Sequence, residues 1–194
     1  MKKTLTLASL ALMTLSLYTP SALAAVSNAK AIELAPHRVD RLVALNKLDK
    51  SFVTKMEKVE VVVVENQAPV YFKATVSQTA PATGNPVQVQ ISLDQDGKPL
   101  AFQLVAGGIA GPDSAWPGKT AGELTENALH YVLENAASGK IALFDKSATS
   151  VTLTKANLNN EAVALGQVRS SATTEKLNIY LKMDGSLIKA EVVP

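Results

Sequence analysis

The chain has 194 residues, 47% of them hydrophobic and 19% charged, which is enough for one domain or two small ones. It has 19 Lys and Arg residues against 17 Asp and Glu residues, and two of the cations, Lys2 and Lys3, lie in a segment that we expect to be removed. The mature chain would then be neutral, which argues against nucleic-acid binding, and the lack of Cys excludes disulfides, thiolate catalysis and sulfur-ligated metals.

Residues 1–24 have the three parts of a secretory signal peptide. Lys2 and Lys3 give a positive start, residues 5–17 form an apolar centre, and Ser21-Ala22-Leu23-Ala24 places small residues before the cleavage point. The apolar centre is shorter than the about 20 residues that a membrane span needs. We therefore expect cleavage after Ala24 and a periplasmic or secreted protein without a membrane span.

A helix and four strands are expected next. Pro36 suits the first turn of a helix, and an apolar stripe at spacings of three and four follows it. The stripe consists of Val39, Leu42, Leu45, Leu48, Phe52 and Met56. Strands are expected over 59–65, 70–79, 87–94 and 100–104. The run 61–64 is four valines, apolar on both sides, and we expect it where two layers or two halves of the protein meet.

The second part of the chain shows a similar order. Residues 108–119 are rich in Gly and Pro and are expected to be a linker. Thr120 and Glu123 have the capping-box spacing for a second helix. Its expected buried side is Leu124, Ala128, Tyr131 and Val132, and Gly139 is expected to end it. Strands are then expected over 150–157, 162–171, 177–181 and 188–192.

Two Asp-Gly hairpins suggest an internal duplication. Asp96-Gly97 and Asp184-Gly185 lie 88 residues apart (184 minus 96), and each is flanked by strands of alternating hydrophobicity. With that offset, Val89, Ile91 and Leu93 correspond to Leu177, Ile179 and Leu181. The pattern predicts an α+β fold of two tandem repeats, each a helix packed on a four-stranded antiparallel meander. The predicted repeats cover 25–107 and 120–194.

On the basis of these two hairpins and the helices before them, the duplicated plan resembles PepSY-like domains. The tandem arrangement also looks like the secreted β-lactamase-inhibitor proteins. The resemblance implies binding or inhibition of another protein. The inhibitor proteins typically carry disulfides, which this chain lacks, and no functional residue of either family can be assigned here.

Motifs for catalysis or cofactor binding are weak in this sequence. The segment 111–120 ends in Gly118-Lys119-Thr120 like a phosphate-binding loop, but six residues separate its glycines where that loop has four. His130 lies four residues from Glu126 and from Glu134, which is typical of a solvated helix face, although metal binding there stays open. His37 is expected to be an exposed residue at a helix start. We predict neither an enzyme nor a cofactor.

The composition and patterning favour a non-catalytic binding module that contacts another exported protein. Strand alternation leaves one polar face on each predicted sheet, and a Trp in a loop can anchor a partner. The predicted contact residues are Trp116, Tyr180, Gln90, Gln103 and Lys182. The alternative is a periplasmic carrier of an apolar, lipid-like ligand, which the four valines and the low charge suggest.

Overall fold

The computed structural model describes residues 24–78, 87–106 and 116–194. The predicted signal peptide and most of the predicted linker lie outside this part of the chain. The elements are α1 (Asn28–Ala44), α2 (Ser51–Thr54), β1 (Met56–Val63), β2 (Phe72–Gln78), β3 (Gln88–Leu93), β4 (Pro99–Ala106), α3 (Ala121–Glu134), the 3₁₀ turn η1 (Gly139–Ile141), α4 (Ala142–Lys146), β5 (Ala148–Leu158), β6 (Glu161–Ser170), β7 (Lys176–Leu181) and β8 (Leu187–Val193).

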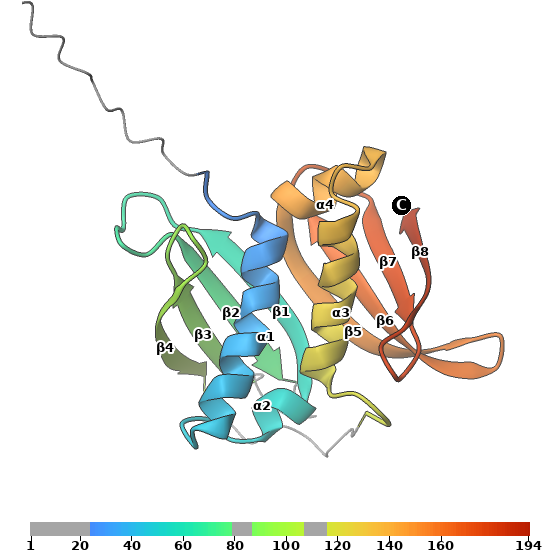
Figure 1. Cartoon of the computed structure of the whole chain (residues 1–194), viewed down its shortest axis with the longest axis horizontal. Coiled ribbons are helices and arrows are strands. Elements are labelled where there is room, and N and C mark those ends of the chain that lie inside the picture. The colour runs from blue at the N-terminus through green and yellow to red at the C-terminus, as the bar shows by residue number, and fades with distance from the viewer. Residues whose placement is uncertain (1–23, 79–86, 107–115) are drawn as a thin grey trace, which may run out of the picture.

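The described strands form a single antiparallel sheet of eight strands in the order β4-β3-β2-β1-β5-β6-β7-β8 (Figure 1). The expectation of two tandem repeats, each with its own four-stranded sheet, is therefore wrong. The sheet is continuous because β1 pairs with β5, with Lys58 opposite Thr152, Val59 opposite Val151 and Glu60 opposite Ser150.

The physical reason for this difference is the open edge that a separate meander would leave at its first strand. Unpaired backbone N–H and C=O groups along a strand edge form hydrogen bonds readily with another strand. In this chain β1 and β5 pair along these edges, and the pairing places Val59 and Val151 in the core. The valine run continues beyond this junction, and Val62 is 63% exposed.

Helix α1 begins eight residues before the predicted start. Ser27 caps it by accepting a hydrogen bond from the Lys30 backbone N–H, and buried alanines at 29, 31 and 35 extend the apolar stripe toward the N-terminus. Pro36 thus lies inside the helix rather than in its first turn. The helix also ends at Ala44, so Phe52 belongs to α2 and Met56 begins β1.

Helix α3 follows the sequence prediction at its start. The Thr120 side chain accepts from the Glu123 N–H at 3.2 Å, and the Glu123 carboxylate accepts from the Thr120 N–H at 2.8 Å. The helix lies close to the sheet at Gly166 of β6, where an added Cβ would be 2.8 Å from the Ala128 Cβ. A side chain at 166 would therefore push α3 away from the sheet.

The two Asp-Gly turns join β3 to β4 and β7 to β8. Gly97 and Gly185 have φ values of +77° and +87°, which favour glycine. Asp94 and Asp184 side chains accept hydrogen bonds from backbone N–H groups within their own turns. Both hairpins agree with the sequence prediction.

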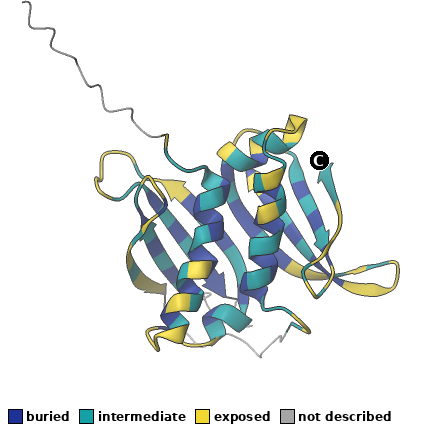
Figure 2. Ribbon diagram, viewed as in Figure 1, coloured by how far each residue is buried: buried dark blue, intermediate teal, exposed yellow. Residues whose placement is uncertain are grey.

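The described helices lie together on one face of the sheet (Figure 1), and buried residues alternate with less buried ones along the strands beneath them (Figure 2). Residues from α1, α3 and strands of both sheet halves join in one hydrophobic cluster. Within the described residues, none of the helices has the length and apolar content needed to cross a membrane. The opposite face of the sheet carries no described helix.

The β1–β5 junction should be sensitive to truncation. Val59 is fully buried, so Val59→Ala should lower the free energy of unfolding by about 2 kcal/mol, since it removes buried methyl groups and leaves a cavity. Val62→Ala makes the same change on the same strand at an exposed position and should cost less than about 0.5 kcal/mol. Urea denaturation measures both. Equal losses in the two variants would contradict the described junction.

Candidate functional site

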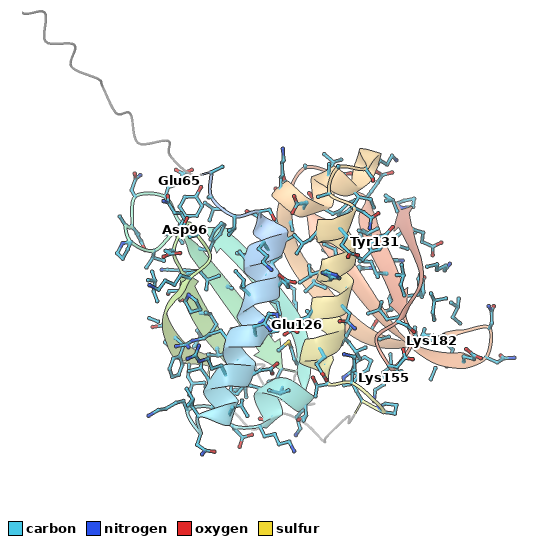
Figure 3. The ribbon with its side chains drawn as sticks, viewed as in Figure 1. Glu65, Asp96, Glu126, Tyr131, Lys155 and Lys182 are labelled. Carbon is cyan, nitrogen blue, oxygen red and sulfur yellow. The ribbon has the colours of Figure 1, made fainter. Side chains whose placement is uncertain are left out.

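A group of carboxylates lies where α1 and α3 pack side by side in antiparallel directions (Figure 1). Glu33, His37 and Asp40 are spaced by four and three residues, so they share one side of α1. Glu123 and Glu126 face them from α3, and Figure 3 shows Glu126 between the two helices. We refer to these five residues as the interhelical cluster.

The cluster holds two buried oxygen atoms without a hydrogen-bond partner, Asp40 Oδ1 and Glu126 Oε1. His37 Nδ1 lies 3.2 Å from Glu126 Oε1, but the contact does not have hydrogen-bond geometry. It is an ion pair only when the imidazole is protonated and the Glu126 carboxyl is ionised. Glu33 is paired with Lys30 of its own helix. At the centre of the helix contact, Asp40 and Glu126 thus each bury a carboxyl oxygen without the hydrogen bond that would offset its loss of water.

Burial raises the pKa of Glu126 to about 7, and the negative charges of Asp40, Glu33 and Glu123 act in the same direction. The pKa of Asp40 is also raised, mainly by burial, although His37 opposes the shift. Glu123 behaves differently, because the Thr120 backbone N–H lowers the pKa of its carboxyl. A proton held on Glu126 thus reduces repulsion within the cluster.

Helical periodicity predicts that Glu126 lies on a solvated face with His130 and Glu134. This is correct for His130 and Glu134, whose side chains are 63% and 61% exposed. His130 Nε2 lies 2.9 Å from Glu134 Oε1. It is wrong for Glu126, whose side chain is only 16% exposed. The difference arises because α1 covers that side of α3, a contact that helical periodicity alone does not reveal. Within the described residues, no three His, Asp or Glu side chains are arranged to hold a metal ion.

The second candidate site is the sheet face opposite the helices, which we call the open face. Strand register places one row of side chains across all eight strands. From β4 to β8 this row is Gln103, Gln90, Thr75, Glu60, Ser150, Arg169, Lys176 and Val193. The neighbouring row is Gln88, Ser77, Lys58, Thr152, Gln167, Asn178 and Glu191.

Side chains of the open face are held by contacts with one another. Gln103 Nε2 donates to Gln90 Oε1 at 3.1 Å, and Gln167 Nε2 donates to Asn178 Oδ1 at 3.1 Å. Tyr180 lies farther along β7. The ammonium of Lys189, on β8, is 4.6 Å from the centre of the Tyr180 ring, within the range of a cation–π contact. These contacts reduce the side-chain freedom that a partner would have to remove on binding.

The structure brings some of the predicted contact residues together and separates others. Gln90 and Gln103 are direct neighbours at one end of the open face, whereas Tyr180 lies on β7 near the other end. Five strand spacings separate β3 from β7, which corresponds to about 24 Å. Lys182 follows Tyr180 just after the end of β7 and is exposed.

Trp116 does not belong to the open face. It is partly buried against the hydrophobic core, and the Lys155 ammonium lies 5.2 Å from the centre of its ring. Lys155 shares the strand parity of Val151 and Leu153, whose side chains are buried on the helix side of β5. The predicted five-residue group is thus distributed over both sides of the sheet.

A pocket of about 630 Å³ lies between the β1–β2 loop and the β3–β4 turn. Its wall includes Glu65, Tyr71, Asp94 and Asp96, and most of its other residues are exposed turn residues. Asp94 is already occupied by the backbone N–H groups of Asp96 and Lys98. A smaller pocket of about 280 Å³ lies beside His130 and Tyr131. Neither pocket includes a residue of the interhelical cluster.

No protein-family model and no curated protein matches this sequence. Among solved structures, the chain is similar to an acyl-CoA thioesterase II, TesB2, from Mycobacterium marinum. The sequences are 11% identical, the match covers 86% of this chain and 88% of that chain, and the TM-score is 0.32. A TM-score this low does not establish a shared fold.

Glu126 should make the stability depend on pH. The folded protein keeps the Glu126 proton up to about pH 7, whereas the unfolded chain loses it near the ordinary pKa of 4.5. The free energy of unfolding should therefore fall as the pH rises between these values and level off above them. Glu126→Gln removes this loss. At pH 8 the free energy of unfolding of this variant should exceed that of the wild type by about 1–2 kcal/mol. This is less than the full pKa shift of Glu126 would give, because the carboxyl is partly solvated.

Urea denaturation from pH 4.5 to pH 8 measures this difference. The control is Glu134→Gln, which changes an exposed carboxyl on the same helix and should follow the wild-type profile. Parallel profiles for the wild type and Glu126→Gln would show that Glu126 is not held protonated between the helices.

Proposed function

We propose that this chain is an exported, non-catalytic module that binds another protein through its open face. The observation that supports the proposal best is the one-sided arrangement of the helices, which leaves eight paired strands uncovered by any described helix. Seven strand spacings give a width of about 34 Å, and strands of six residues give a height of about 20 Å. This area is close to the about 800 Å² that each partner contributes to a standard interface.

The chemistry of the open face suits a protein partner. Its two lateral rows are rich in Gln, Asn, Thr and Ser, which both donate and accept hydrogen bonds. Tyr180 adds an aromatic ring with a polar end, a residue type that often contributes strongly to interfaces. Because these side chains stand on paired strands and bond to one another, little ordering would be needed on binding.

Within this proposal, Gln90, Gln103, Tyr180 and Lys182 contact the partner, and Trp116 has a structural role. A single partner of ordinary size could reach from Gln90 to Tyr180 across the face. The interhelical cluster serves helix packing, since Glu126 is largely buried against α1 and lines neither of the pockets described above.

Photo-cross-linking in the cells that naturally produce the protein tests this proposal. A benzoylphenylalanine placed at Gln90 or at Tyr180 should form adducts with another protein. The same residue at Arg41, which is exposed on α1, should not. The expected difference in adduct yield is about tenfold or more, because only the open-face positions would be buried in the interface. Adducts of equal yield at Arg41, or none from either open-face position, would contradict the proposal.

A further inference from the structure

Two cations stand directly opposite each other on the open face. Arg169 of β6 pairs in register with Lys176 of β7, so the two side chains project from neighbouring positions on the same face. Like charges in this position are destabilising. Among the described contacts, neither side chain forms an ion pair, whereas Lys58 and Lys189 pair with Glu60 and Glu191 at 2.6 and 3.0 Å.

The open face as a whole has an excess of positive charge. Beyond the two rows already given, register places Lys73 opposite Ser92 and Tyr180 opposite Lys189. The cations of the face are then Lys58, Lys73, Lys189, the Arg169–Lys176 pair and, just after β7, Lys182, against the carboxylates of Glu60, Glu161 and Glu191. Glu60 and Glu191 already have lysine partners, and Glu161 lies at the far end of β6 from Arg169, so Lys73, Arg169, Lys176 and Lys182 remain available to a binding partner.

The helix side has no matching excess of negative charge. The interhelical cluster contributes four carboxyl groups from α1 and α3, but α1 also carries Lys30, Arg38 and Arg41. The positive excess is therefore a property of the open face. A face with an excess of one sign of charge attracts a partner of the opposite sign.

We propose that the partner presents carboxylate groups to the open face, and that the Arg169–Lys176 pair anchors one of them. This inference rests on the proposed function. A guanidinium offers two parallel N–H groups to a carboxylate, and the neighbouring ammonium adds charge without a fixed geometry. The adjacent Gln167 and Asn178 side chains can hydrogen-bond to the groups beside that carboxylate. Binding would also relieve the repulsion between the two cations.

A protein partner fits this charge better than a nucleic acid. Proteins that bind nucleic acid through phosphates contact about six to ten of them and carry a strongly basic surface. Among its described residues, the open face has four cations for which no ion pair is seen, Lys73, Arg169, Lys176 and Lys182, set among uncharged polar side chains. This balance suits a few specific carboxylates.

The test uses benzoylphenylalanine at Gln90, where the cross-linker is distant from the charge pair. Adduct yield is compared between the otherwise unchanged chain and one that also carries Arg169→Gln and Lys176→Gln. The control is Lys50→Gln, which removes an exposed cation next to α2. We expect the double variant to lose about tenfold in yield and Lys50→Gln to lose none. The yield of the unchanged chain should also fall between 50 and 300 mM NaCl.

Urea denaturation of the double variant shows whether a lower adduct yield reflects weaker binding or unfolding of the chain. Because the two substitutions remove a like-charge contact, the urea midpoint of the double variant should equal or exceed that of the wild type. An undiminished yield in the double variant would overturn this inference and leave the proposed function in place. Open-face adducts that contain nucleic acid and no protein would contradict both. If the unchanged chain gave no open-face adduct at all, the proposed function would fail, and this inference with it.

Discussion

The pairing of β1 with β5 is the contact on which the rest of this structure depends. Three residue pairs, from Lys58–Thr152 to Glu60–Ser150, join strands that are about 90 positions apart in the chain into one sheet. That pairing places α1 beside α3 and gives the helices a common layer on one face (Figure 1). It also makes the other face continuous over eight strands. Both candidate sites follow from this one junction.

The two sites illustrate how one arrangement produces two different electrostatic environments. Between the helices, Asp40 and Glu126 are partly withdrawn from water, and protonation of Glu126 lowers the cost of bringing the carboxyls together. On the open face, Arg169 and Lys176 lie opposite each other, and Arg169 is exposed to solvent. The helix layer thus buries carboxyl groups, while the sheet layer carries cations at its surface.

The sequence allowed the local features of the fold to be predicted, because their signals lie within a few residues. Alternating hydrophobicity and Asp-Gly located both hairpins, and Thr120 with Glu123 located the start of α3. The start of α1 was misplaced because Pro36 was given more weight than Ser27 and the alanines that follow it. The joining of all strands into one sheet could not be predicted, since edge pairing between β1 and β5 has no local pattern.

The candidate sites were predictable to a similar, partial extent. Alternation correctly assigned Gln90, Gln103 and Tyr180 to strand positions outside the core, but it could not give the distance between them. Glu126 was assigned to solvent because a helical wheel shows the polar side of one helix and not the neighbour that covers it. Arg169 and Lys176 were missed because only the β6–β7 register places them opposite each other.

A disulfide across the β1–β5 junction tests the central claim most directly, because the chain has no Cys of its own. Glu60→Cys with Ser150→Cys should oxidise to an intramolecular disulfide, since these residues are direct neighbours on adjacent strands. Thr75→Cys with Ser150→Cys should stay reduced, because β1 lies between the two positions and separates them by about 9–10 Å. Thiol labelling followed by mass spectrometry measures both outcomes. Free thiols in the first pair, or a disulfide in the second, would contradict a continuous sheet joined at β1 and β5.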